Sequence, residues 1–174
     1  MLDAFDDVND VGSYLPEFVY GANDGIVTTF AVVAGVTGAA LDPGIVVVLG
    51  VANLLVDGFS MGMSNFLSER AERDYERTLG SHTTGTKSPT RTALATFAAF
   101  VVAGTAPLLP YLFGFAGSFP VSVALTAVAF FAVGASRALV TDRRWYLTGL
   151  EVFAVGMLAA SVAFAVGELL RGVA

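Results

Sequence analysis

The stretch VANLLVDGFSMGMSNFLSER, residues 51–70, is the part of the sequence that decides the fold. It is mostly apolar, and as a helix rising about 1.5 Å per residue it is long enough to cross the roughly 30 Å hydrocarbon core of a bilayer. It nevertheless contains Asp57, which lies twelve residues, or roughly 18 Å along a helix, before the charged boundary residue Glu69. A charged group at the bilayer centre costs about 2.5–3.5 kcal/mol on insertion scales and is usually functional. The stretch therefore predicts a transmembrane helix that carries a functional carboxylate.

The composition of the whole chain supports a membrane protein. Of its 174 residues 55% are hydrophobic and only 14% are charged, and the mean hydropathy is +0.72, whereas soluble domains carry about 25% charged residues. With no cysteine and a single histidine, His82, the chain can form neither a thiolate metal site nor a multi-histidine cage on its own. The net charge of −6 argues against a nucleic-acid partner.

Apolar runs predict an all-α integral membrane protein with five transmembrane helices. The predicted spans are residues 18–40, 45–67, 92–113, 120–140 and 146–170. They form one domain, residues 18–170, which follows an acidic cytoplasmic segment, residues 1–17. Residues 68–91 are predicted to extend the second helix to about Leu79 and then to form a flexible loop. Pro107 and Pro110 are predicted to bend or end the third helix.

Basic residues predict the orientation. Eight of the nine fall in the second and fourth connections or at their edges, and only Arg171 lies near the C-terminus. Because cytoplasmic loops carry an excess of Lys and Arg, we expect a cytoplasmic N-terminus and a C-terminus outside. The chain is also rich in Asp and poor in Lys, and we expect it in the cell membrane of a prokaryote.

A polar stripe runs along the second predicted helix. Its members, spaced by three or four residues, are Asn53, Asp57, Met61, Ser64 and Ser68. The stripe combines hard oxygen atoms with one soft sulfur atom, a set that late first-row metals and copper(I) tolerate but magnesium and calcium do not favour. The alternative is that Asp57 bonds to a neighbouring helix and Met61 fills a gap in the core.

A second carboxylate, Asp24, lies near the cytoplasmic end of the first predicted helix. Thr28, Ala31, Gly35 and Gly38 share its face, and small residues let another helix approach closely. The alternative is that Asn23 or Asp24 caps the start of that helix.

Two glutamates of the last helix have competing interpretations. Glu151 is a candidate for a secondary proton route, or it pairs with Arg143 or Arg144. Glu168 is expected to form an ion pair with Arg171, one turn away.

The extension after the second span carries further acidic residues. Those that share one face are Glu69, Glu72 and Glu76. They form either a weak metal-collecting face or part of a solvated helix with i,i+4 ion pairs, Glu69 with Arg73 and Arg70 with Asp74.

We do not expect an enzyme or a tightly bound cofactor. Gly58–Gly62 matches the G-x-S-x-G nucleophile pattern, but that pattern requires a strand-to-helix turn, and here it falls inside a helix. The chain also lacks H-E-x-x-H and Glu-x-x-His pairs, so neither a zinc protease nor a di-iron site is supported.

Three segments resemble a known family. GANDGIVTTFAVVAGV, residues 21–36, resembles the first-helix signature of the vacuolar iron transporter family, and VDGFSMGMSNFLSER, residues 56–70, resembles its second-helix signature. SRALVTDRRWYLTGLEVFAVGMLAASVAFAVG, residues 136–167, is similar to its last two helices. The resemblance covers nearly the whole chain from about Tyr20.

The resemblance implies a five-helix homodimer that exports iron(II), and often manganese(II), from the cytosol in exchange for protons. The pathway would run between the subunits, and the matching site positions are Asp24 and Met61. Two features depart from the family pattern. Ser64 and Asn65 replace a common Gly-Glu pair, and residues 68–91 replace a long glutamate-rich metal-binding domain, so the chain resembles the shorter relatives.

The leading hypothesis is a proton-coupled exporter in which Asp24 and Asp57 bind the metal ion and Met61 favours softer metals. Pairing of two chains about a two-fold axis would double the stripe to four carboxylates and two thioethers. Coupling would follow from competition, because a protonated carboxylate does not ligate a metal. The alternatives are a membrane protein that binds metal or a partner helix without transport, and a transporter of another solute.

Overall fold

The computed structural model describes residues 12–80, 87–139 and 141–171, and throughout these ranges its regular structure is helical. Its elements are α2 (Leu15–Gly38), α3 (Pro43–Thr78), α4 (Pro89–Gly104), η1 (Ala106–Leu108), α5 (Leu109–Leu112), α6 (Ser118–Ser136), η2 (Arg137–Leu139) and α7 (Trp145–Leu169). Five helical segments are long and apolar enough to cross a membrane, which confirms the predicted fold class. Residues 1–11 of the acidic segment and loop residues 81–86, including His82, lie outside the described residues.

Local signals explain where α3 begins and how far it extends. The Asp42 side chain accepts a hydrogen bond of 2.7 Å from the backbone N–H of Gly44, and Pro43 occupies the first helical position, both favourable at a helix start. The 36 residues of α3 correspond to about 54 Å, well beyond the roughly 30 Å hydrocarbon core. The last turns of α3 therefore project out of the membrane, and the helix ends at Thr78, one residue before the predicted limit.

Prolines interrupt the third span as predicted. α4 ends at Gly104, and the chain continues through η1 and α5, which contain Pro107 and Pro110. A proline removes one backbone donor and its ring clashes with the preceding turn. The carbonyl oxygen of Pro107 accepts a hydrogen bond of 2.7 Å from Ser122 Oγ on α6, which ties the interrupted segment to the bundle.

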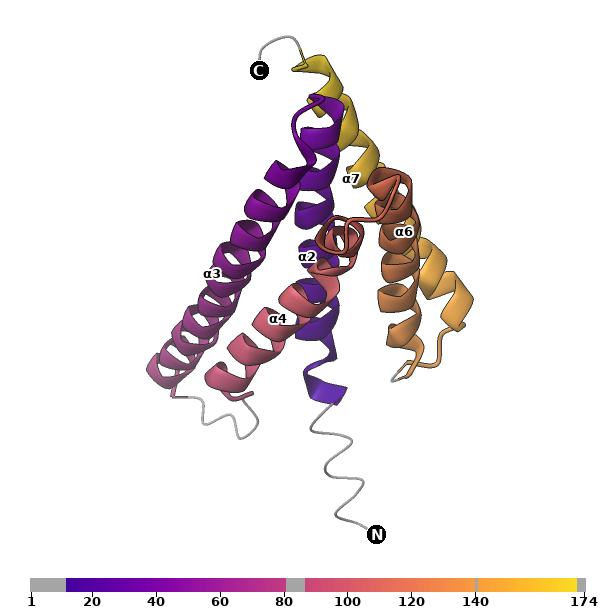
Figure 1. The fold of residues 1–174 in the computed structure, drawn as a ribbon. Coiled ribbons are helices and arrows are strands. Elements are labelled where there is room, and N and C mark those ends of the chain that lie inside the picture. Colours follow the sequence, from indigo (N-terminus) through magenta and orange to yellow (C-terminus); the bar gives the residue numbers. More distant parts are fainter. Residues whose placement is uncertain (1–11, 81–86, 140, 172–174) are drawn as a thin grey trace.

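Helix α2 occupies the middle of the bundle (Figure 1), with α3 and α4 on one side and α6 and α7 on the other. Two clusters of buried side chains surround it. One includes Phe30, Val33 and Phe100, and the other includes Ile26 and Phe130. The central helix is therefore the element that joins the two halves of the molecule.

Glycines bring the neighbouring backbones close to α2. A Cβ atom built on Gly21 would lie 2.5 Å from the carbonyl oxygen of Thr96, and one on Gly25 would overlap the carbonyl oxygen of Phe100 on α4. At the other end of α2, a Cβ atom on Gly38 would lie 2.9 Å from the backbone nitrogen of Glu168 on α7. Of the small residues that the sequence analysis placed on the Asp24 face, Gly38 thus permits a close helix approach, to α7, whereas the approach to α4 depends on Gly21 and Gly25, which lie outside that set.

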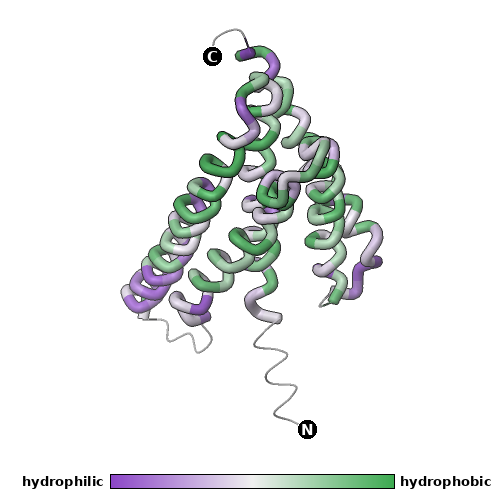
Figure 2. The backbone as a smooth tube through the Cα atoms, in the orientation of Figure 1, coloured by the Kyte–Doolittle hydropathy of each residue, from purple (hydrophilic) through white to green (hydrophobic). Residues whose placement is uncertain are grey.

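Polar residues are distributed unequally between the two ends of the bundle (Figure 2). Hydrophilic residues gather at the C-terminal part of α3, the start of α4 and the α6–α7 connection, which all lie at the end where α2 begins. Those segments carry eight of the nine basic residues. The assignment of this end to the cytoplasm stays a prediction from charge.

Substitution of Gly25 tests the close packing of α2 on α4. Gly25→Ala is expected to lower the melting temperature and the yield of purified protein, because the added methyl group meets the carbonyl oxygen of Phe100. Gly35→Ala on the same helix is the matched control, since a Cβ atom there meets nothing within 4 Å. Alanine also favours a helix over glycine by about 0.5–1 kcal/mol. Equal melting temperatures of the two variants in detergent would contradict the packing.

Candidate metal centre

Hydrogen bonds join α2 and α3 at the level of the two predicted carboxylates. Asn53 Nδ2 on α3 donates to Thr28 Oγ1 on α2 at 3.3 Å, and Thr28 Oγ1 donates to the backbone oxygen of Asp24 at 2.9 Å. Asp57 lies one helical turn after Asn53, as Thr28 lies one turn after Asp24. The polar faces of both helices therefore meet, which brings together residues that are far apart in the sequence.

The carboxylates of Asp24 and Asp57 are both half-buried, and they lie close enough for their negative charges to repel each other. Among the described residues, no side chain or backbone group donates a hydrogen bond or forms an ion pair with either carboxylate. Two neighbouring carboxylates at membrane depth are unfavourable unless a proton or a cation compensates them. The arrangement is thus suited to hold a cation between α2 and α3.

Two alternative roles for these carboxylates are wrong. α2 begins at Leu15, nine residues before Asp24, so neither Asn23 nor Asp24 caps it. Asp57 makes no hydrogen bond to a neighbouring helix within the described part of the chain. A capping or bridging carboxylate would accept such bonds, and these two do not.

The remaining members of the polar stripe have different surroundings. Met61 is half-buried and packs against the core cluster that contains Phe100, as the gap-filling alternative predicted. Ser64 and Ser68 are exposed. Asn65 lies about 80° around α3 from Asp57, and its Nδ2 donates to Thr96 Oγ1 on α4 at 2.7 Å. The Asn65 side chain is therefore directed away from Asp57.

The described residues of one chain do not complete a metal site. Among the described residues, no three His, Cys, Asp or Glu side chains are grouped so that they could hold a metal ion. The structure supplies two carboxylates, one thioether and the amide of Asn53, at the border of an α3 face that is exposed at Ser60 and Ser64. Further ligands would have to come from outside the described residues.

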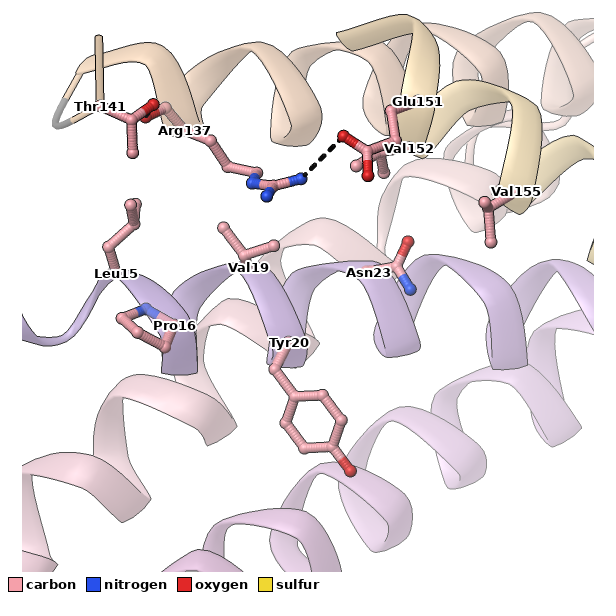
Figure 3. Close-up of a pocket in the computed structure, with 10 residues that line it drawn as sticks. All are labelled: Leu15, Pro16, Val19, Tyr20, Asn23, Arg137, Thr141, Glu151, Val152 and Val155. Carbon is pink, nitrogen blue, oxygen red and sulfur yellow. Dashed lines mark hydrogen bonds and ion pairs between the residues drawn. The ribbon is translucent and has the colours of Figure 1, made fainter. Parts of the chain in front are cut away.

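Glu151 belongs to a different place, a cavity of about 540 Å³ between the first half of α2 and the α6–α7 hairpin (Figure 3). Its carboxylate pairs with Arg137 Nη1 at 3.4 Å, so the expected pairing with Arg143 or Arg144 is wrong. The antiparallel hairpin explains the pairing, because positions 137 and 151 are equally far from position 144 in the turn. That symmetry was a sequence signal that could have identified Arg137.

Asn23 also lines this cavity, and its Oδ1 atom is buried without a hydrogen-bond partner. The cavity contains neither Asp24 nor Asp57 among its lining residues. The structure therefore keeps Glu151 apart from the carboxylate pair.

The ion pairs predicted for the two helix ends are also wrong. Asp74 pairs with Arg77 at 3.0 Å rather than with Arg70, whose guanidinium lies 5.7 Å from the ring centre of Phe66. The backbone N–H of Arg171 donates to the Glu168 carbonyl at 3.2 Å, and no ion pair joins their side chains. Arg73 donates to the carbonyl oxygen of Lys87 and does not pair with Glu69. Glu69, Glu72 and Glu76 lie on the projecting part of α3 and form no metal cluster within the described residues.

Sequence reasoning missed an ion pair at the predicted cytoplasmic end. Glu17 is buried on α2, and its Oε1 accepts a hydrogen bond of 2.7 Å from Nζ of Lys87, just before α4. Nearby, the backbone N–H of Ser88 donates to the Tyr14 hydroxyl at 3.3 Å. The sequence offered one indication of this ion pair, namely that Lys87 is the single lysine of the chain. The pair anchors the start of α4 to α2.

Removal of Lys87 is expected to destabilise the fold. Lys87→Gln leaves the buried Glu17 carboxylate without its cation, a change that typically costs about 1–3 kcal/mol, so the melting temperature should fall clearly. Arg77→Gln breaks a pair whose side chains are 74% and 65% exposed, and exposed pairs contribute about 0–1 kcal/mol. Thermal unfolding in detergent measures the melting temperatures of both variants. A smaller decrease for Lys87→Gln than for Arg77→Gln would contradict the anchoring role of the Glu17–Lys87 pair.

Comparison with known proteins finds a match along most of the chain. The family model described as VIT family matches residues 15–85 and 77–168. The two matched segments meet between α3 and α4, at the connection that the sequence analysis identified as short.

Similar curated proteins carry related names. A vacuolar iron transporter of Toxoplasma gondii (strain ATCC 50861 / VEG) is 45% identical over 67 residues, which are 38% of this chain and only 22% of that protein. Vacuolar iron transporter 1 of Eucalyptus grandis is 22% identical over 223 aligned positions, covering 92% of this chain and 88% of the relative. Vacuolar iron transporter homolog 5 of Oryza sativa subsp. japonica is 28% identical over 169 positions, covering 91% and 81%. Because 223 positions exceed the 174 residues of this chain, the Eucalyptus relative has segments without a counterpart here.

Proposed function

The chain belongs to the VIT family, and from that premise we propose that it is a proton-coupled transporter that exports iron(II) or manganese(II) from the cytosol. The names of its relatives support a role in metal transport. The observation that carries the proposal is the pair of half-buried, unpartnered carboxylates of Asp24 and Asp57 between α2 and α3. A divalent cation offsets their repulsion and is released when the carboxylates are protonated.

The ligand types favour a transition metal. Carboxylate oxygens bind iron(II) and manganese(II), and the Met61 thioether adds a soft ligand that magnesium and calcium do not favour. In a single chain Met61 packs against the core, so its sulfur would reach the ion after a change of rotamer, which the flexible methionine side chain permits.

Two copies of the chain would complete the coordination. A two-fold axis beside the exposed Ser60–Ser64 face of α3 would bring two Asp24–Asp57 pairs together. Four carboxylates and two thioethers would then surround the pathway. The homodimer is part of the proposal because the described residues of one chain group no three His, Cys, Asp or Glu side chains around an ion.

Proton coupling follows from competition for the same oxygens. A carboxylate that binds a proton loses its affinity for the metal, so protons entering from the opposite side would displace the ion. An inward proton gradient would then drive metal out of the cytosol. Release of these protons to the cytosol would return the carboxylates to the ionised state required for the next ion.

Metal flux across the membrane of vesicles that contain the purified protein tests the metal site. Under an imposed pH gradient, Asp24→Asn and Asp57→Asn are each expected to lower the rate of iron(II) or manganese(II) flux at least tenfold, because an amide neither bears the charge nor exchanges a proton at neutral pH. Glu168→Gln is the control, since it makes the same chemical change at the far end of α7. Native rates in both aspartate variants would refute the assignment.

Cross-linking tests the two-fold pairing directly. The chain has no cysteine, so a single cysteine reports one contact. Ser64→Cys is expected to give a disulfide-linked dimer on non-reducing gels, whereas the exposed α7 position Ser161→Cys should give little. The reverse pattern, with Ser161→Cys cross-linked and Ser64→Cys monomeric, would place the interface elsewhere.

A second candidate function is metal binding without transport. The packing of Met61 into the core favours it, because a rigid site binds an ion without passing it on. Measurements on the native protein distinguish the two functions. If iron(II) or manganese(II) raises its melting temperature but no metal flux is seen in the vesicles, the protein binds metal without transporting it.

A further inference from the structure

A pocket lined by arginines lies where α3 leaves the membrane. It has a volume of about 240 Å³ and is formed by Phe66, Arg70, Arg73, Asp74 and Arg77 of α3 and by Pro89 of α4. Its lining thus contains three arginines and one carboxylate, Asp74, which is already paired with Arg77 at 3.0 Å. The pocket therefore has an excess of positive charge.

The geometry suits an anion at the level of the lipid headgroups. The apolar run of α3 ends at Leu67, and Arg70 lies only about 4.5 Å further along the helix. Arg73 is held in place by the carbonyl oxygen of Lys87. The first turn of α4, which begins at Pro89, has no side-chain cap, and the partial positive charge of a helix N-terminus adds to the field.

A separate apolar groove lies deeper in the membrane between the same two helices. It has a volume of about 230 Å³ and lies between Phe59 and Met63 of α3 and Ala93, Leu94 and Phe97 of α4. Six of the eight α3 residues that line the two cavities share one helical face because they are spaced by three or four residues: 59, 63, 66, 70, 73 and 77. Along α4, positions 89, 93 and 97 are likewise one turn apart. We call the surface formed by these two cavities the α3–α4 seam.

We propose that the α3–α4 seam binds an anionic phospholipid, with its phosphate between Arg70, Arg73 and Arg77 and an acyl chain in the apolar groove. Basic pockets between membrane helices on the cytoplasmic side commonly bind anionic headgroups. The order of the two cavities along the seam, charged outside and apolar inside, matches that of a phospholipid.

The seam is separate from the proposed metal pathway. Phe59 and Asp57 are two residues apart on α3, which places them about 200° apart around the helix. A second copy that packs on the Asp57 side of α3 would leave the seam open to lipid. The lipid would brace the projecting part of α3 against α4.

Thermal unfolding of the full chain in detergent tests the proposal with three additives: phosphatidylglycerol, phosphatidylcholine and inorganic phosphate. Phosphatidylglycerol is expected to raise the melting temperature of the native protein, because a ligand that binds only the folded state stabilises it. Phosphatidylcholine and inorganic phosphate should raise it little. The double variant Arg70→Gln/Arg77→Gln should bind phosphatidylglycerol about 30-fold more weakly, since each basic residue near an anionic surface contributes about 1 kcal/mol and 1.4 kcal/mol corresponds to a factor of ten.

The matched control is Arg143→Gln/Arg144→Gln, which removes two arginines from the same end of the molecule but outside the pocket. It should respond to phosphatidylglycerol as the native chain does. Equal stabilisation of both double variants would overturn the proposal, as would equal effects of phosphatidylglycerol and phosphatidylcholine. An equal effect of inorganic phosphate would overturn it as well, because the pocket would then bind a free anion. Native mass spectrometry of the same samples counts the retained lipid and shows whether the double variant has lost it.

Discussion

The close contact between the backbones of α2 and α4 is the constraint on which the rest of the structure depends. Inside a bilayer, lipid tails are as apolar as leucine side chains, so helices associate through tight packing and interhelical hydrogen bonds. Gly21 and Gly25 provide this packing, because their missing side chains let α2 lie against the carbonyl oxygens of Thr96 and Phe100. Once that face of α2 is fixed on α4, its neighbouring polar face with Asp24 and Thr28 is turned toward Asn53 of α3.

The charged groups of the bundle fall into two kinds. Glu17 and Glu151 are compensated by basic residues from other elements, Lys87 and Arg137. Asp24 and Asp57 have no such partner among the described residues, and each is instead the neighbour of the other. A permanent counter-ion makes a carboxylate part of the scaffold, whereas an uncompensated pair is available to a mobile cation or proton. This contrast supports the assignment of the pair, rather than of Glu151, to the proposed pathway.

In these proposals helix α3 has two functional faces. Its polar stripe would meet a second copy of the chain across the metal pathway, and the α3–α4 seam would hold a phospholipid on the opposite side. Many apolar side chains of α3 are exposed, such as Val56, Phe59 and Leu67. In a membrane such side chains need no protein partner, but the cavities beside them favour particular neighbours.

The sequence by itself determined the five spans, the break at Pro107 and Pro110, the projecting end of α3 and the polar character of Asp24 and Asp57. These features follow from local chemistry, because length, hydropathy, prolines and helical spacing act within one element. Only the tertiary structure decided which partners the side chains found. It brought Asp24 beside Asp57, paired Glu151 with Arg137 and Glu17 with Lys87, and directed Asn65 toward Thr96. Such pairings depend on how helices rotate and approach one another, which is set by glycine contacts between distant segments and is not encoded in the spacing of any single helix.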